Sequence, residues 1–299
     1  MKSISIIVNE NTLNKIKSFY EDHLIPNNNK NALFIAKIDG CTITAYHTKK
    51  VLFQGKNSET EAAMWEGIKN DKKSVSTNQN QHSYYLDCIG SDEVGTGDYF
   101  GPVVVVSAFL DKDKLPLIKT LNIDDSKKLT DNDIMKIAPT LFKNIPYSLL
   151  VVHNEKYNEV MKQKDMNLNK LKAVLHKQAI SNLLNKIKQQ PPIIIDQFCS
   201  IEHFNKYINE RNFTKGIHFH TKAESKYASV ACASMMARYI FLQEMKKLSE
   251  SLKTTLNKGA SNQVDIQGKE LVQKYGPDIL NKVAKHHFKN TEKIKALID

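Results

Sequence analysis

The sequence predicts an α/β protein in which a mixed sheet with flanking helices follows a smaller domain of strands and helices. After about residue 84, short apolar runs alternate with segments of helical periodicity. Before residue 70, the order is one strand, a helix, three strands and a helix. Between them, the polar stretch 71–83 has no periodicity and no large apolar residue, as is typical of a linker. We therefore expect an N-terminal domain at 1–70 and a larger domain at 84–299.

The composition excludes several classes of protein. The chain has 299 residues, of which 41% are hydrophobic, so it can bury a core in each of two domains. No apolar run reaches the roughly 18 residues that a membrane span needs, and the N-terminus lacks a signal-peptide pattern. Four cysteines, at positions 41, 88, 199 and 232, form no CxxC pair. This spacing argues against a zinc site or a disulfide framework, and it predicts a cytoplasmic protein.

The formal net charge of +11 has two interpretations. One is a solvated, lysine-rich surface. The other is a polyanionic partner, which would be nucleic acid or an acidic membrane. Arg211 and Arg238 are the two arginines of the chain, so contacts to phosphate would fall mainly to lysines.

The N-terminal domain is expected to be a sheet with two helices on one side. The predicted strands cover 3–9, 32–38, 41–48 and 51–55; the predicted helices cover 12–24 and 58–70, the second opening with a Ser-x-x-Glu capping box. Helices on one side leave the other sheet face free. Counting by twos puts Lys37, Thr42, Thr44 and Tyr46 on that face, which is either a binding surface or an ordinary solvated one.

The larger domain is expected to alternate strands and helices. The predicted strands cover 84–91, 102–110, 147–153, 191–196 and 216–220. The predicted helices cover 130–143, capped by Thr130 or Asp131, then 166–188, 201–210, 225–248 and a tail from about 264.

Two of these buried strands end in acidic residues. Asp92 and Glu93 follow the strand 84–91, and Asp196 ends the strand 191–196. In open α/β sheets, ligands lie at the carboxyl ends of strands. Carboxylates at the edge of an apolar core are costly unless a cation compensates them. Acids that converge from separate strands suit Mg²⁺ or Mn²⁺, and two such ions can promote in-line phosphoryl displacement.

A glycine-rich loop follows the acidic pair. Gly95 and Gly97 lie within "GTGDYF" and Gly101 follows it, while Gly90 lies two residues before the acidic pair. A loop without side chains lets backbone groups approach a phosphate or a sugar hydroxyl closely, although a tight turn would also use glycines. The spacing matches neither the dinucleotide fingerprint nor the Walker loop.

Several motifs together resemble the type 2 ribonuclease H family, and most closely its ribonuclease HIII branch. They are "GSDEVGTGDYFGPVVV", "DDSKKLT", "IIIDQF" and "TKAESKYASVACASMMARYIF", and the closing "KYGPDILNKVAKHHFKNTEKI" also fits. The N-terminal domain resembles one half of a TATA-box-binding protein. The resemblance covers nearly the whole chain and implies a ribonuclease H-like mixed sheet behind a TATA-box-binding-protein-like α+β domain.

The resemblance implies a metal-dependent endoribonuclease that cuts the RNA strand of RNA–DNA hybrids and leaves 5′-phosphate and 3′-hydroxyl ends. The catalytic and metal-binding acids would be Asp92, Glu93, Asp196 and Glu224. Glu224 lies in "KAES", where the ribonuclease HII branch usually has Asp, and Glu244 is its rival. The expected cofactor is Mg²⁺ or Mn²⁺, with two ions in the reaction and no organic cofactor.

The resemblance also suggests residues that contact the substrate. The loop "GTG" would meet the ribose 2′-hydroxyls, which separate RNA from DNA. The full set of expected substrate-binding residues is Gly95, Thr96, Gly97, Lys127, Lys128, Ser234, Arg238, Lys37 and Tyr46. We expect a monomer whose partner is the hybrid duplex and not a membrane. The alternatives are a DNA nuclease with a similar acidic site and a hybrid-binding protein without activity.

Overall fold

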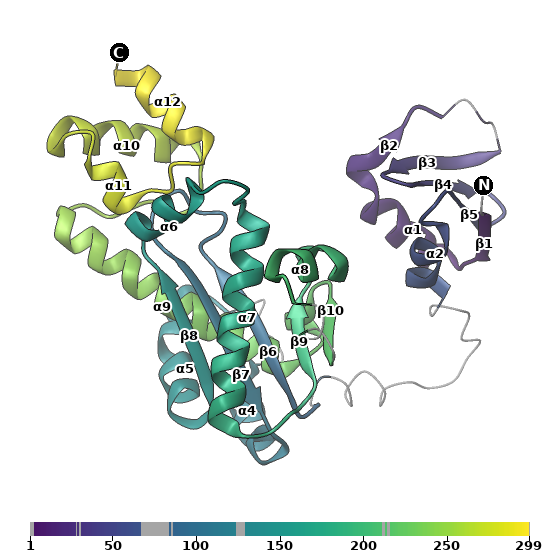
Figure 1. The fold of residues 1–299 in the computed structure, drawn as a ribbon, viewed down its shortest axis with the longest axis horizontal. Coiled ribbons are helices and arrows are strands. Elements are labelled where there is room, and N and C mark those ends of the chain that lie inside the picture. The colour runs from purple at the N-terminus through teal and green to yellow at the C-terminus, as the bar shows by residue number, and fades with distance from the viewer. Residues whose placement is uncertain are drawn as a thin grey trace. The chain divides into compact units, whose positions relative to one another are not determined.

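The computed structural model describes residues 3–27, 29, 31–66, 84, 86–123, 129–210, 213 and 216–298. The chain divides into two compact units, Met1–Ser76 and Thr77–Asp299 (Figure 1). The expected linker at 71–83 lies outside the described residues. Within the described parts, no helix is both long enough and apolar enough to cross a membrane.

The N-terminal unit is an antiparallel five-stranded sheet with the order β1-β5-β4-β3-β2. Its strands are β1 (Ser3–Ile7), β2 (Leu24–Ile25), β3 (Ala32–Ile38), β4 (Cys41–Tyr46) and β5 (Lys50–Gln54). Its helices are α1 (Glu10–Phe19), the 3-10 turn η1 (Glu21–His23) and α2 (Ser58–Glu66). Ile16 and Trp65 from the helices join Ile43 and Phe53 of the sheet in one buried core.

Helix α1 begins before the predicted residue 12, whereas α2 begins at Ser58 as predicted but without the predicted capping box. Helix α1 begins at Glu10, because the Asn9 side chain accepts a hydrogen bond from the Thr12 amide at 2.8 Å. The capping box predicted at Ser58 is wrong: its buried hydroxyl has no hydrogen-bond partner among the described residues. Instead the Asn57 carbonyl accepts the Glu61 amide at 3.0 Å, so the helix starts from Asn57.

The larger unit is a mixed five-stranded sheet with the order β10-β9-β6-β7-β8. Strands β6 and β9, and β9 and β10, are parallel, whereas β6, β7 and β8 pair antiparallel. The strands are β6 (Cys88–Val94), β7 (Val103–Leu110), β8 (Tyr147–Val152), β9 (Ile193–Asp196) and β10 (Ile217–His220). This is the ribonuclease H-like mixed sheet that the sequence predicts.

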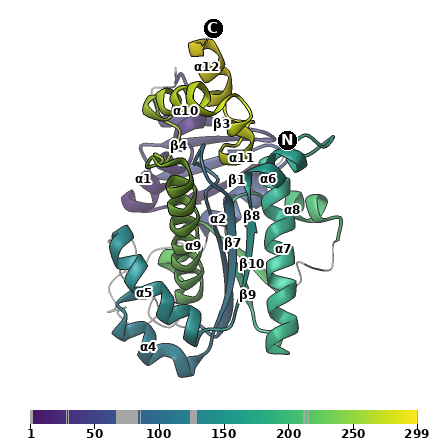
Figure 2. The same ribbon diagram turned by 90° about the vertical axis from the view of Figure 1, so that its left-hand side faces the viewer.

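Helices cover both faces of this sheet (Figure 2). They are α4 (Leu115–Thr120), α5 (Asp131–Asn144), α6 (Asn154–Met161), α7 (Leu168–Ile187), α8 (Ile201–Ile208), α9 (Ala228–Leu252), α10 (Asn262–Tyr275), α11 (Ile279–Val283) and α12 (Lys289–Ile298), with the 3-10 turns η2 (Lys112–Lys114) and η4 (Ala223–Ser225). Helix α5 begins at the predicted cap Thr130, whose side chain exchanges hydrogen bonds with Asp133.

The side-chain alternation of β7 assigns a different helix to each face of the sheet. Val104 and Val106 pack in the core that contains α9 and α5. Val103 and Val105 pack with residues of α7. The strand is buried along its whole length because α9 and α7 cover opposite faces, and this explains the continuous apolar run.

Candidate active site

Strand β6 continues through the acidic pair instead of ending before it. Asp92 pairs with Val106 and Glu93 with Val105 of the neighbouring strand β7. Because successive residues of a strand point to opposite faces, the two carboxylates diverge. Asp92 points toward α9, where Ser234 donates a hydrogen bond to it. Glu93 points toward α7, where it contacts His176.

Asp92 and Asp196 lie side by side on the face that α9 covers. Ser91 is in register with Ile195 in the parallel pair β6–β9, so the next residue of each strand is an aspartate. Both side chains are half-buried. The Ala223 amide donates a hydrogen bond of 2.8 Å to Asp196 Oδ1, which joins η4 to the site.

The environment of the two aspartates disfavours negative charge. Burial raises the pKa of Asp92 well above its usual range, and the charges of Glu93 and Asp196 raise it further. Burial also raises the pKa of Asp196, to which the charges of Glu224 and Glu93 add. A bound cation would compensate these charges, so the donor set fits a hard divalent ion.

Glu224 belongs to this acidic group, whereas Glu244 does not. Glu224 is half-buried in η4, one residue after the amide that binds Asp196. Glu244 lies on α9 ten residues beyond Ser234, which is roughly 15 Å along the helix. It forms an ion pair with Lys247 at 2.6 Å, and His153 Nδ1 lies 3.7 Å from its Oε2. The geometry therefore favours Glu224 over its rival.

Glu93 is held by two basic residues of α7 that the sequence reasoning missed. Lys172 pairs with Glu93 Oε1, and His176 Nε2 lies 2.9 Å from Glu93 Oε2. Burial alone would raise the pKa of Glu93, but the hydrogen bond and charge of His176, together with Lys172, lower it on balance. The sequence did contain an indication of this contact, because Lys172 and His176 lie four residues apart among the apolar residues of a predicted helix.

His176 is itself fixed from behind. Its Nδ1 lies 2.7 Å from the Ser91 hydroxyl, which contacts the Ser107 hydroxyl at 2.8 Å. The ring of Phe198 stacks on the imidazole with centroids 5.4 Å apart. The histidine is fully buried, so this network sets the orientation of the Glu93 carboxylate.

Three of the four glycines have structural roles. A Cβ at Gly90 would lie 2.2 Å from the Val230 backbone nitrogen, so this glycine lets α9 pack directly on β6. Gly95 has a φ of +94°, and its Cβ would lie 2.2 Å from the Pro102 carbonyl oxygen. The Cβ of Gly101 would meet Met245 Sδ at 2.4 Å. At these three positions the absence of a side chain is required by the packing or the turn, which is the alternative that the sequence left open.

Gly97 differs from the other glycines. It is exposed, and no atom lies within 4 Å of the position that its Cβ would take. Together with the neighbouring half-buried Thr96, it leaves backbone accessible at the tip of the glycine loop, residues 95–101. This is the part of the loop that a ligand can approach.

The other expected substrate residues are dispersed. Ser234 reaches Asp92, whereas Arg238, one turn later on α9, forms an ion pair with Asp131 at 2.5 Å. Lys127 and Lys128 lie outside the described residues. In the N-terminal unit, Lys37 pairs with Thr42 in register, which puts both on the sheet face away from the helices.

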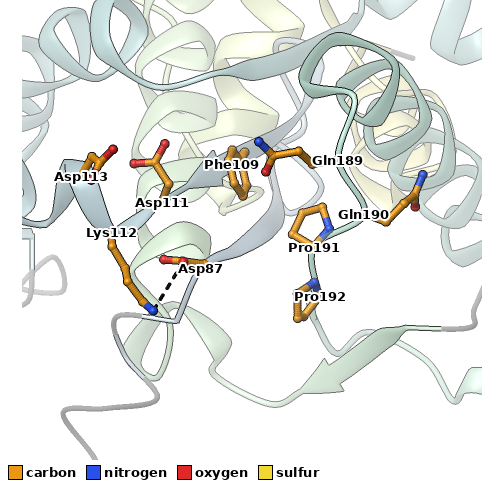
Figure 3. Close-up of a pocket in the computed structure, with 9 residues that line it drawn as sticks. All are labelled: Asp87, Phe109, Asp111, Lys112, Asp113, Gln189, Gln190, Pro191 and Pro192. Atoms are coloured by element: carbon orange, nitrogen blue, oxygen red, sulfur yellow. Dashed lines mark ion pairs between the residues drawn. The ribbon is translucent and has the colours of Figure 1, made fainter.

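A separate pocket of about 610 Å³ lies at the opposite ends of these strands (Figure 3). It is lined by Asp87, Phe109, Asp111, Lys112, Asp113, Gln189, Gln190, Pro191 and Pro192. Asp87 precedes β6 and Pro192 precedes β9, whereas Asp92 and Asp196 lie toward the carboxyl ends. The pocket is therefore not part of the acidic site. Within the residues described, no three His, Cys, Asp or Glu side chains are gathered closely enough to form a ready-made metal cluster.

The chain matches two family models. The model described as ribonuclease HII covers residues 89–291, and a domain of unknown function (DUF3378) covers residues 3–78. Ribonuclease HIII of Bacillus velezensis is 46% identical over 305 residues, which are 98% of this chain and 97% of that protein. Ribonuclease HIII of Bacillus thuringiensis subsp. konkukian is 42% identical over 308 residues, 99% of each chain. The chain belongs to the ribonuclease HIII family.

The solved structures agree with this assignment. The crystal structure of Bst-RNase HIII in complex with Mn²⁺ has a TM-score of 0.70 and 36% identity, and the match covers 100% of this chain and 99% of that one. Ribonuclease HIII is an endonuclease that degrades RNA in RNA–DNA hybrids, and it depends on a divalent metal. The predicted family, fold class and activity are thus confirmed.

Proposed function

We propose that Asp92, Glu93, Asp196 and Glu224 bind the catalytic metal and that the chain cuts the RNA strand to leave 5′-phosphate and 3′-hydroxyl ends. The proposal rests chiefly on one observation: Asp92 and Asp196 are neighbours in register, and the pKa of each is raised by burial and by nearby acids. Mg²⁺ or Mn²⁺, with two ions in the reaction, would supply an activated water for in-line attack and would stabilise the leaving oxygen.

The residues around the acids orient them. Ser234 and the Ala223 amide each hold one aspartate, so the carboxylates keep a fixed separation before any ligand arrives. Glu93, held by His176 and Lys172, keeps its negative charge and is also proposed to reach a ribose 2′-hydroxyl. The aspartates on the α9 face and Glu93 on the α7 face are thus proposed to have different roles in one site.

We further propose that the glycine loop reads the sugar and that basic residues bind phosphate. Gly95, Thr96 and Gly97 are proposed to meet the 2′-hydroxyls through their backbone, which the open space at Gly97 supports, and Gly95 also sets the turn. Lys127 or Lys128 contacts a backbone phosphate. The guanidinium of Arg238 is half-exposed and has five N–H donors. Its pair with Asp131 therefore leaves donors that can bind a phosphate of the substrate.

The N-terminal unit is proposed to bind the duplex backbone. Its free sheet face carries Lys37, Thr42 and Tyr46, groups that can reach phosphate or sugar without reading bases. The protein is proposed to act as a monomer in the cytoplasm, where its four free cysteines would stay reduced.

Cleavage of three duplexes side by side tests the proposal. The substrates are an RNA–DNA hybrid, an all-DNA duplex and a duplex with one embedded ribonucleotide, each with Mg²⁺, with Mn²⁺ and with chelator. We expect metal-dependent cleavage of the hybrid with 3′-hydroxyl ends and an intact all-DNA duplex; the third substrate measures how many ribonucleotides are required. Equal cleavage of all-DNA would indicate a DNA nuclease, and binding without cleavage would indicate an inactive binding protein.

A further inference from the structure

Lys285 is a fully buried lysine whose ammonium contacts the glycine loop. It lies two residues after α11 and is 0% exposed. Its Nζ is 2.7 Å from the Asp98 carbonyl oxygen, 2.5 Å from that of Gly101 and 3.4 Å from that of Phe100. Long charged side chains are rarely buried without a specific partner, so this placement requires a reason.

The backbone of the same segment also pairs with the loop. The Lys285 amide donates to the Tyr99 carbonyl at 2.9 Å, and the Gly101 amide donates to the Val283 carbonyl at 2.9 Å. Phe100 and Ala284 form an isolated antiparallel bridge between these two bonds. The segment after α11 therefore acts as a short strand against the second half of the glycine loop.

Asp98 links the segment after α11 to the first half of the glycine loop. Its amide donates to the Gly95 carbonyl at 3.4 Å, and its Oδ1 accepts the Gly259 amide at 2.6 Å. Its carbonyl is bound by Lys285. The Gly101 carbonyl has a second donor, the Asn154 side-chain amide of α6, at 2.9 Å.

The chemistry explains why a lysine suits this position. An ammonium has three N–H donors, and the loop offers three carbonyl oxygens to one side chain. A buried carbonyl without a hydrogen-bond donor is costly, so the loop would relax if the ammonium were removed. Burial lowers the pKa of Lys285 to about 7, which the nearby charge of Asp98 opposes.

We propose that Lys285 is a positioning residue that holds the glycine loop in the conformation that discriminates RNA from DNA. The inference rests on the proposed contact between the loop and the ribose, and it extends that function to the C-terminal segment. Lys285 does not touch the substrate. It acts through the carbonyls of Asp98, Phe100 and Gly101, which fix where the accessible backbone around Gly97 lies.

The test compares Lys285→Met with the unchanged full-length protein. Methionine keeps most of the apolar stem and removes the ammonium. Dissociation constants for an RNA–DNA hybrid and for an all-DNA duplex of the same sequence are measured with Ca²⁺, and hybrid cleavage is measured with Mg²⁺. We expect the preference for hybrid to fall at least about tenfold and kcat/KM to fall by about 10²-fold, the scale of a displaced positioning group.

A matched control separates positioning from stability. Lys293→Met removes a lysine of the same C-terminal region that pairs with buried Asp265 at 3.2 Å and contacts a different part of the fold. It should lower the melting temperature while leaving the ratio of the two dissociation constants unchanged. If Lys285→Met does not fold, Asn154→Ala, which removes one donor to Gly101, should lower the ratio in the same direction by a smaller factor.

The outcomes distinguish this inference from the function it rests on. If the unchanged protein does not prefer hybrid over DNA, the proposed role of the glycine loop is wrong. If the unchanged protein prefers hybrid and Lys285→Met keeps the same ratio, Lys285 serves stability alone and the inference is wrong.

Discussion

Asp92 and Glu93 are adjacent in sequence but lie in opposite chemical environments. Asp92 and its neighbour Asp196 have raised pKa values because of burial and like charge, whereas His176 and Lys172 lower the pKa of Glu93. This difference arises because successive side chains of β6 point to opposite faces of the sheet, one toward α9 and the other toward α7. Paired acids with diverging pKa values are typical of sites in which the two groups have separate roles.

We expect Asp92→Asn and Asp196→Asn to lower cleavage by at least about 10³-fold, because an amide keeps the shape but loses the charge that holds a divalent ion. Without divalent ions, the free energy of unfolding should stay equal or rise, since one member of a repelling group is removed. Cleavage assays and denaturant melts in chelator measure the two effects. Near-normal turnover in either variant would exclude that aspartate as a metal ligand.

The choice between Glu224 and Glu244 gives a second prediction at this scale. Glu224→Gln should reduce activity severely, because Glu224 is a proposed metal ligand close enough to Asp196 for its charge to raise the pKa of that residue. Glu244→Gln serves as the matched control and should stay close to normal, since it loses only pairs with Lys247 and His153. Steady-state kinetics on the hybrid compares the two variants. If Glu244→Gln were the more impaired, Glu244 on α9 would be the fourth acid.

At the scale of elements, the site depends on how closely α9 packs on β6. Gly90 brings the backbone of Val230 against the strand, and this brings Ser234 within hydrogen-bonding reach of Asp92. Helix α9 is rich in small buried residues, among them Ala231, Ala233 and Ala237, and these allow the close packing. The close packing therefore positions Asp92, a proposed metal ligand, as well as filling the core.

Gly95 and Gly97 differ in the space around them, and paired substitutions can test whether Gly97 has its proposed contact with the substrate. Gly97→Val should fold with stability within about 0.5 kcal/mol of the unchanged protein but lose hybrid cleavage, because its new side chain would occupy the accessible backbone. Gly95→Val should be destabilised by about 1–3 kcal/mol or more through its positive φ and its contact with Pro102. Thermal melts and hybrid cleavage are measured on both; normal cleavage by Gly97→Val would show that the loop does not read the sugar.

Periodicity predicted most of the elements, and its failures have physical causes. Helix α6 was not predicted, because two of its three buried residues are Asn154 and Asn158, which bond to the Gly101 and Ala284 carbonyls. A pattern of apolar residues cannot reveal a polar residue that is buried to satisfy distant backbone. For the same reason the roles of His176 and Lys285 were not visible, since their partners are far away in sequence.

The molecule as a whole consists of two units with separate cores. Ile16, Ile43 and Phe53 belong to a cluster confined to the N-terminal unit. The acids and the glycine loop belong to the larger unit. Residues 1–70 hold nine lysines against seven acidic residues, so most of the net charge of +11 lies in the rest of the chain. A binding role for the N-terminal unit therefore depends on its local sheet face and not on overall charge.

This division predicts how the fragment 84–299 should behave. It contains every proposed catalytic acid together with four of the five hydrophobic clusters found among the described residues, so it should fold and keep the chemistry. Loss of the sheet face with Lys37 and Tyr46 should raise KM and affect kcat less, which is the pattern of lost uniform binding. Each lost contact between a lysine and a phosphate should make the slope of log K against the logarithm of the salt concentration less steep by roughly one unit.

Kinetics on hybrids of several sequences, at several salt concentrations, measure these effects. The loss of affinity should be similar for every sequence, because contacts to phosphate and sugar carry no base information. The full chain with Lys37→Ala is the control, since it should reproduce part of the change in salt dependence while both units remain present. If the fragment binds hybrid as tightly as the whole chain, the N-terminal unit does not bind substrate, and its free sheet face is then available for contact with another protein.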